Sequence, residues 1–174
     1  MNEDRNPLPL LLVTEAIREL ENLNDKNSQL SSHICNLGKK PGFVMVALIQ
    51  TNPADFENLD VICRFIANQF SREVFNSTAK YNLTSNTFTL TYDKAPSWFQ
   101  SLSPIINAGT SLQTSPTPQQ FWFQSYAHFL LGVFCGAFLH FGYDAKPSLA
   151  KLSPLTLSFK LEELQETWEF SDQQ

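Results

Sequence analysis

The stretch from Tyr126 to Tyr143 carries no formally charged residue, and this constrains the fold more than any other feature of the chain. Within it, Phe134, Phe138 and Phe141 recur at spacings of four and three, as residues on one face of an α-helix do. Gly142 stands where a left-handed glycine closes a helix. The sequence therefore predicts one helix that is apolar nearly all round, and such a helix must be buried.

Three environments could bury this helix: lipid, the core of the protein or another chain. Its length of about 27 Å is slightly short of a bilayer hydrocarbon core. No Lys or Arg anchors either end, and His128 and His140 would need partners in lipid. We therefore expect the central helix of a soluble domain. Gly132 and Gly136 lie one turn apart, which would let a second backbone approach closely.

Length and composition indicate a single globular domain over residues 1–174. Hydrophobic residues make up 43% of the chain and aromatic residues 13%, with 15 Phe, which predicts an aromatic core. A net charge of −5 and a pI near 5.1 argue against a nucleic-acid-binding protein, because no basic stripe is present to replace counterions.

Cysteine usage favours a reducing compartment. Cys35, Cys63 and Cys135 are widely spaced and form no C-x-x-C pair, so we expect free thiols and no metal site. The amino terminus has mixed charge and a short apolar run over residues 8–13, unlike a secretory signal. A cytoplasmic location is the expectation.

Helical spacing of apolar residues predicts three further helices. The first covers about residues 8–23. The second begins between Ser28 and Ser32 and runs to Leu48, with Pro41-Gly42 as a kink or a helix start. The third is capped by Asp55 and extends to Phe75, with acidic residues in its first turn.

Strict alternation of polar and apolar residues predicts strands at 87–92 and 155–161, and residues 148–152 are expected to pair with the latter. Residues 98–106 form a strand or an irregular segment. Residues 107–120 are polar and contain prolines, which predicts a mobile loop, and an acidic tail is expected from residue 162. The expected fold class is α+β, with about four helices packed on a small twisted antiparallel sheet.

Motifs for catalysis and cofactor binding are absent from the sequence. It has no glycine-rich phosphate loop, no G-x-S-x-G and no H-E-x-x-H, so we expect no enzyme, no catalytic residue and no cofactor. His128 and Cys135 are two helical turns apart, which does not bring a nucleophile and base into contact. A hydrolase using Cys135 remains a weak hypothesis. A ligand role for His128 or His140 stays open beside the simpler reading of a hydrogen-bonded histidine.

The excess of apolar residues indicates either an internal cavity or an exposed patch for a partner. Candidate residues for a hydrophobic pocket lie on the long helix and on the third helix. They are Phe65, Ile66, Phe129, Gly132, Val133 and Gly136.

Several short motifs, taken in order, resemble the small subunits of the transport protein particle (TRAPP), the family with the Bet-three-like fold. The similarity runs in register over about residues 36–161, and the order and spacing of the motifs carry it rather than any single one. The motifs are Asn36–Gly42, Asp55-Phe56, Leu59–Ile62, Arg64–Phe70, Val74-Phe75, Gly132–Ala137 and Gly142–Ala145, followed by the strand at 155–161.

This resemblance implies helices on a twisted antiparallel sheet and dimerisation, as a homodimer or with a protein partner, through the helical layer. Family members scaffold a vesicle-tethering and nucleotide-exchange assembly and are not enzymes alone. In the acylated member a cysteine before the Asp-Phe step carries a fatty chain, and Pro53 stands there in this sequence. The arginine usual between the two glycines is Cys135 here.

The leading hypothesis is therefore a cytoplasmic scaffold that dimerises, with at most peripheral membrane association. The alternative is a prokaryotic relative of the same fold, similar to 4-vinyl-reductase-type domains, that binds a small hydrophobic molecule in an internal pocket.

Overall fold

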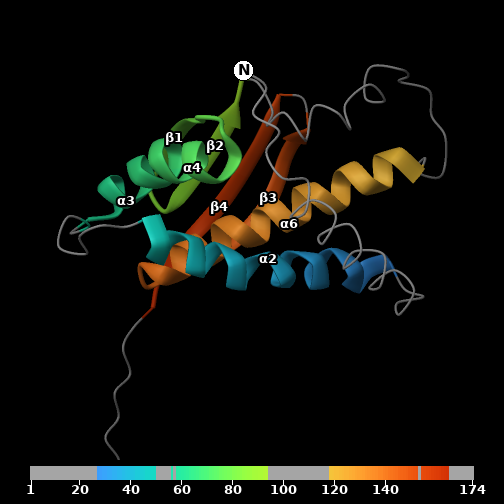
Figure 1. Cartoon of the computed structure of the whole chain (residues 1–174), viewed down its shortest axis with the longest axis horizontal. Coiled ribbons are helices and arrows are strands. Elements are labelled where there is room, and N and C mark those ends of the chain that lie inside the picture. The colour runs from blue at the N-terminus through green and yellow to red at the C-terminus, as the bar shows by residue number, and fades with distance from the viewer. Residues whose placement is uncertain (1–26, 50–55, 57, 94–117, 153, 165–174) are drawn as a thin grey trace, which may run out of the picture.

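The computed structural model of the chain describes residues 27–49, 56, 58–93, 118–152 and 154–164 (Figure 1). These residues form three helical rods and one four-stranded antiparallel sheet, which confirms the α+β fold class. The expected helix at 8–23 and the segment at 98–106 lie outside the described residues.

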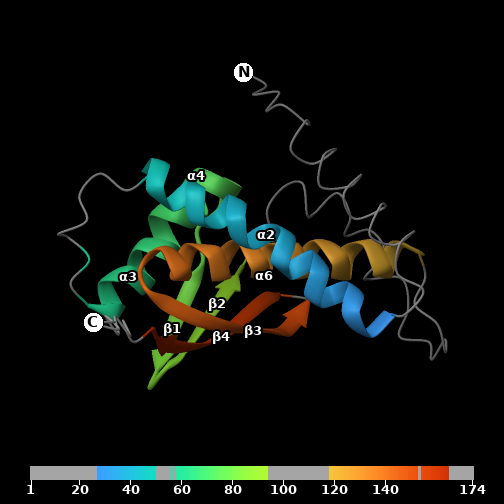
Figure 2. The same ribbon diagram turned by 90° about the horizontal axis from the view of Figure 1, so that it is seen from below.

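Helix α6, Pro118–His140, is the central element of the fold. Figure 2 shows it between helix α2, Asn27–Ile49, on one side and the sheet on the other. From residue 125 to residue 138 every side chain is buried except those of His128 and Phe129, which are half-buried. The apolar character all round α6 follows from this position, because α2 and the sheet cover opposite sides of it. The prediction of a buried rod is confirmed.

The ends of α6 differ from the sequence-based expectation. The helix begins at Pro118 rather than Tyr126, so the predicted loop at 107–120 is wrong for its last three residues, and the rest of that loop lies outside the described residues. At the other end the helix stops at His140. Gly142 adopts a left-handed φ of 82° and donates its N–H to the Leu139 carbonyl at 3.1 Å, as the closing glycine was expected to do.

Helix α2 is continuous across Pro41, so the alternative of a helix start at Pro41-Gly42 is wrong. Proline removes one backbone donor from a helix interior, which sequence rules treat as a break. Gly42, next to this proline, lies against the backbone of α6, as described below.

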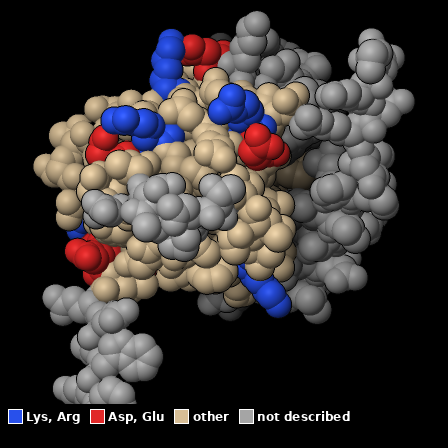
Figure 3. Space-filling view, turned by 60° about the vertical axis from the view of Figure 1, so that its left-hand side comes forward, with Lys and Arg blue, Asp and Glu red and all other residues tan. Residues whose placement is uncertain are grey.

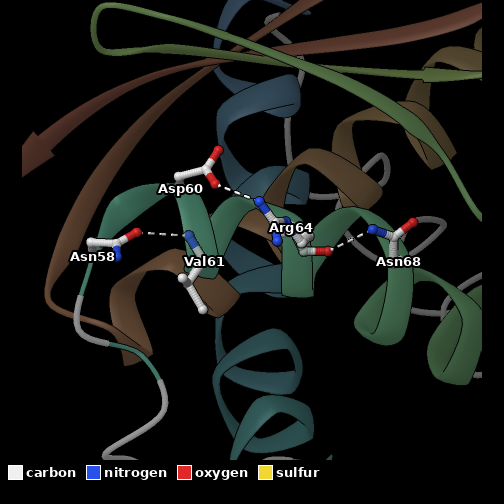
Figure 4. A network of polar contacts seen from close by, with 5 residues as sticks. All are labelled: Asn58, Asp60, Val61, Arg64 and Asn68. Carbon is white, nitrogen blue, oxygen red and sulfur yellow. Dashed lines mark hydrogen bonds and ion pairs between the residues drawn. The ribbon is translucent and has the colours of Figure 1, made fainter.

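The third predicted helix is observed as α3, Leu59–Phe65, a π-helical turn η2, Ile66–Phe70, and α4, Ser71–Phe75. Its cap is Asn58, whose side-chain oxygen accepts the Val61 N–H at 3.0 Å, and not Asp55 (Figure 4). The helix therefore starts later than expected.

Polar side chains support the first turns of this rod, as Figure 4 shows. Asp60 lies in the first turn, as expected for an acidic residue there, and pairs with Arg64 at 2.9 Å. At the junction with η2 the Asn68 amide donates to the Arg64 carbonyl at 3.0 Å. Both contacts are on the exposed side of the rod.

The π-helical turn is supported from the buried side. The Ser71 hydroxyl donates to the Ile66 carbonyl at 2.8 Å and lies 3.0 Å from the Tyr92 hydroxyl on the sheet. The Ala79 N–H donates to the Ala67 carbonyl at 3.1 Å. Carbonyls displaced from the regular helical ladder thus find partners outside it.

The sheet has the order β1-β2-β4-β3, with every neighbouring pair antiparallel. Its strands are β1 Lys80–Thr84, β2 Thr87–Tyr92, β3 Tyr143–Leu152 and β4 Leu155–Glu163. The predicted strands at 87–92, 148–152 and 155–161 are confirmed, although β3 starts earlier. Strand β4 continues to Glu163, and the rest of the acidic tail predicted from about residue 162 lies almost entirely outside the described residues. Strand β1 was missed.

Aromatic rings join the sheet to α6. Phe88 of β2 pairs with Phe159 of β4 in the sheet register, and both side chains are fully buried. The Phe138 ring of α6 lies 5.3 Å from the Phe88 ring and 5.8 Å from the Phe159 ring, and Phe134 lies 5.8 Å from Phe159. These four rings, with the geometry favoured by aromatic pairs, form the centre of the core.

Candidate functional site

The two glycines of α6 lie directly against the backbone of α2. A Cβ atom placed on Gly132 would lie 1.8 Å from the carbonyl oxygen of Cys35, and one on Gly136 would lie 1.9 Å from that of Lys39. Both distances are far below van der Waals contact. The absence of a side chain at these two positions is therefore what allows the helices to approach.

Two glycines of α2 face α6 in the same way. A Cβ on Gly38 would lie 2.3 Å from the Phe129 carbonyl oxygen, and one on Gly42 would lie 1.9 Å from that of Val133. The two helices thus meet through a reciprocal pair of G-x-x-x-G motifs, which confirms the expected close approach of a second backbone. This contact fixes which side of α2 turns inward.

The side of α2 that turns away from α6 is exposed and apolar. We call it the outer α2 face, made of Leu37, Val44, Met45 and Leu48. Leu48 is 80% exposed and Val44 46%, whereas Val46, on the inward side, is 0% exposed. No charged residue occurs from position 41 to position 49. Exposed Lys40 stands between Leu37 and Val44 at helical spacings of three and four, so the uncharged part of the outer α2 face is Val44, Met45 and Leu48. Exposed apolar side chains gathered on one side of a helix indicate a site of interaction.

A second group of apolar residues lies where α2 passes the end of α6. The Phe43 ring, 41% exposed, meets the His140 ring edge-on at 4.9 Å, and Leu139 beside it is 41% exposed. Partial burial lowers the pKa of His140 below its usual value, because burial disfavours the charged imidazolium.

An aromatic cluster joins the end of α6 to the start of α3. The Phe56 ring lies 4.9 Å from that of Phe65 and 4.8 Å from that of Phe141, and the last two are 5.8 Å apart. Phe65 is buried and the other two are half-buried. Phe141 thus follows the end of α6 and packs on α3, instead of continuing the sheet-facing stripe expected from its spacing.

The six pocket candidates from the sequence fall into two groups. Phe65 and Ile66 are buried on the α3–η2 rod, and the other four lie on α6 where it crosses α2. The open sides of Gly132 and Gly136 face α2 backbone. All except the glycines belong to one hydrophobic core or pack against it.

All three cysteines are buried free thiols. The Cys135 thiol donates to the Ala145 carbonyl at 3.3 Å, and its pKa is raised by the neighbouring Cys35 sulfur and by burial. Burial raises the pKa of Cys63 to about 12. A protonated, buried thiol is not an activated nucleophile, so the hydrolase hypothesis gains no support from Cys135.

His128, one of the two α6 histidines considered as a ligand, makes a local contact. The Nδ1 atom of His128 lies 2.7 Å from the Gln124 carbonyl, which fits the simpler interpretation of a hydrogen-bonded histidine. Among the described residues, no group of three or more His, Cys, Asp or Glu side chains is placed to hold a metal ion.

Charged side chains of both signs lie on the surface of the described residues, and several of them form ion pairs. Lys80 contacts Asp93 and Lys146 contacts Glu162, each at 2.7 Å and exposed to solvent. On the face drawn in Figure 3, blue and red side chains lie among a larger uncharged area. Within the described part of the chain, no helix combines the length and hydropathy required to cross a bilayer.

The sequence and the structure were compared with known proteins. No family model and no curated protein matches the sequence. Among solved structures, the chain is similar to the trafficking protein particle complex subunit 3 of Naegleria fowleri, which is covalently bound to palmitic acid. The TM-score is 0.66 at 13% identity, and the match covers 91% of this chain and 96% of the other. The fold is TRAPP-like. The resemblance expected from the sequence motifs is thus confirmed at the level of the TRAPP-like fold.

Proposed function

We propose that this chain is a non-catalytic scaffold subunit that dimerises through its helical layer, with the outer α2 face at the contact. The single observation that carries the proposal is this face, on which Leu48 is 80% exposed in a helix whose opposite side is packed against α6. The TRAPP-like fold supports a role in an assembly of similar subunits.

The occupant that fits the outer α2 face best is a second copy of this chain. In a two-fold dimer each residue near the axis meets the same residues of the partner, so any charge there would face a like charge. The segment from Pro41 to Ile49 carries no charge, so it can pack on itself without this repulsion. Homodimerisation is accordingly the form of the proposal.

The same fold also supports a proposal for the cellular role. Similarity to a trafficking protein particle subunit supports a place in a vesicle-tethering complex on the cytoplasmic side of membranes, in a cell that has such vesicles. The outer α2 face would then hold a subunit in the assembly, and membrane association would be peripheral. No nucleic-acid partner is proposed, because the chain has a net charge of −5 and no basic stripe to replace counterions.

Sedimentation equilibrium of the purified chain tests the proposal. The wild type is expected at about twice 19.8 kDa. Val44→Glu and Leu48→Glu should each yield monomers with unchanged circular dichroism, since a glutamate at the interface would be buried opposite its own copy. Gln69→Glu, which adds the same charge on the exposed side of η2, is the matched control and should stay dimeric. A monomeric wild type, or dimeric glutamate variants, would contradict the proposal.

A second candidate function is the binding of a hydrophobic molecule, as in 4-vinyl-reductase-type domains. The observation that favours it is the fatty acid bound to the similar subunit. Binding here would be non-covalent, because Pro53 stands where the acylated family member has its cysteine. The candidate lining residues are Phe65, Ile66, Phe129, Gly132, Val133 and Gly136.

Solvent extraction of the purified chain followed by mass spectrometry tests this second function. A stoichiometric fatty acid or other apolar molecule is the expected result, and Ile66→Trp, which enlarges one of the candidate lining side chains, should reduce its amount. Gln69→Trp on the exposed side is the control. A protein that releases nothing and takes up no added palmitate would exclude this function.

A further inference from the structure

Three exposed apolar side chains lie around the end of α6, apart from the outer α2 face. They are Phe43, Leu139 and Leu164, which are 41%, 41% and 47% exposed. The Phe43 ring meets the ring of His140, the last residue of α6, at 4.9 Å. The Leu164 N–H donates to the carbonyl of Gly142, two residues after the helix ends, at 2.8 Å. We call Phe43, Leu139 and Leu164 the α6 end patch.

A row of aromatic rings continues from this patch. The Phe141 ring lies 5.4 Å from the His140 ring and 4.8 Å from the Phe56 ring, and both phenylalanines are half-buried. With Phe43, these rings reach from α2 past the end of α6 to the residues before α3. Such a row favours contact with another aromatic side chain, because offset and edge-to-face ring pairs are stabilising.

The segment that follows β4 begins at this patch. Leu164 is the last described residue, and the sequence continues over 165–174 as QETWEFSDQQ. Trp168 comes four residues after Leu164, and four extended residues span at most about 14 Å. Gly142, bonded to Leu164, is two residues from His140, so the Cα atoms of these two are at most about 7.6 Å apart. Trp168 can therefore reach the patch while β4 stays paired.

The charges of this segment and of α2 are complementary. Residues 165–174 include acidic side chains on both sides of Trp168 and no Lys or Arg. Lys39 and Lys40 precede Phe43 by four and three residues, which places them beside it on the surface of α2. Within the described residues neither lysine forms an ion pair. The two lysines are therefore available to the acidic segment next to the ring of Phe43.

We propose that the α6 end patch is the docking site for residues 165–174 of the same chain, with the Trp168 ring as the anchor against Phe43 and Leu139. Tryptophan is among the side chains that contribute most when buried at a contact. A short tether gives the segment an effective concentration at the patch of roughly millimolar order, so a weak contact is sufficient. The docked segment leaves the outer α2 face open, so this inference does not depend on the proposed dimerisation.

Fluorine NMR of the full chain labelled with 5-fluorotryptophan tests the proposal. The chain has 3 Trp, and Trp168→Phe assigns the resonance of position 168. In the wild type this resonance should lie away from its position in the urea-denatured chain. It should also shift less between H2O and D2O, because a docked ring is shielded from water. Phe43→Ala and Leu139→Ala, which truncate exposed side chains, should each return it towards the denatured position.

Leu37→Ala is the matched control, because Leu37 is 40% exposed on the same helix as Phe43 but belongs to the outer α2 face. It should leave the Trp168 resonance unchanged, and so should Leu48→Glu, which separates this inference from dimerisation. A wild-type resonance at the denatured position, or one that neither patch variant moves, would overturn the proposal. A shift that disappears on dilution or in Leu48→Glu would overturn it too, because the segment would then bind a second copy.

Discussion

The carbonyl oxygen of Cys35 lies 1.8 Å from the point where a Cβ on Gly132 would be, so the two helices of the layer touch backbone to backbone. This relationship determines how the rest of the helical layer is arranged. It buries one side of α2 against α6, and it leaves Leu48 and its neighbours facing outward. The exposed apolar surface is thus a consequence of the glycine contact.

Replacing Gly132 by alanine should destabilise the fold. In an ordinary helix interior this change stabilises by roughly 0.5–1 kcal/mol. Here the added methyl group meets backbone, so we expect a net loss of about 1–3 kcal/mol in the free energy of unfolding, measured by urea denaturation. Gly142→Ala is the comparison, because nothing lies within 4 Å of its Cβ and only the left-handed φ costs about 1 kcal/mol. A stabilised Gly132→Ala variant would show that the helices are further apart.

Truncating Phe138 should be far more costly than truncating its neighbour Leu139. Phe138→Ala removes a fully buried ring between β2 and β4, for which we expect a loss of about 3–5 kcal/mol. Leu139→Ala changes a side chain that is 41% exposed and should cost well under that amount. Equal losses in urea denaturation would contradict the placement of α6 on the sheet.

The buried hydroxyls of Ser71 and Tyr92 should be coupled. Tyr92→Phe leaves Ser71 its bond to the Ile66 carbonyl and should cost about 0.5–1.5 kcal/mol. Ser71→Ala leaves the buried Tyr92 hydroxyl without this partner and should cost about 1–3 kcal/mol. In a double-mutant cycle the double variant should lose less than the sum, and strict additivity would exclude the contact.

Acidification should weaken the fold partly through His140. Its folded pKa is lowered by burial, so the unfolded chain takes up a proton first as the pH falls through about 6.5. At pH values lower than this, the free energy of unfolding should therefore decrease. At higher pH values His140 should have no effect on it. The non-titrating His140→Gln variant should lose less stability than the wild type between about pH 7.5 and 5.5. Parallel pH profiles of the two proteins would contradict this.

Sequence patterns predicted those helices and strands in which the spacing of apolar residues matches the side that is buried in the core. The alternation over 87–92 and 155–161 reflects strands with one buried face, and the uncharged rod reflects a helix covered on two sides. Strand β1 was missed because Lys80, Asn82 and Thr84 point to solvent on an edge strand, which leaves only two half-buried positions as a signal. Asn58 was overlooked as the cap because an acidic residue stood nearby.

Less of the candidate site than of the fold could be predicted from the sequence. The glycines of α6 were recognised as a close-approach motif, but their partners on α2 were not, since Pro41 suggested an interruption there. The apolar residues of the outer α2 face served only to predict a helix there, and which of them are exposed was not predicted. One signal could have indicated that α2 is apolar on its exposed side as well as on its buried side. It is the uninterrupted apolar run from Phe43 to Ile49, which is longer than a single buried face of a helix requires.

A photo-crosslinking amino acid at position 48 tests the central claim most directly, because Leu48, at 80% exposed, is the most exposed residue of the outer α2 face. After illumination of the purified chain, we expect adducts of twice the chain mass, with the crosslink mapped by mass spectrometry to residues 41–49 of a second copy. The same group at position 69, on the exposed side of η2, should give none. Adducts at position 48 that stay within one chain, or that map to a different surface of the second copy, would contradict the claim.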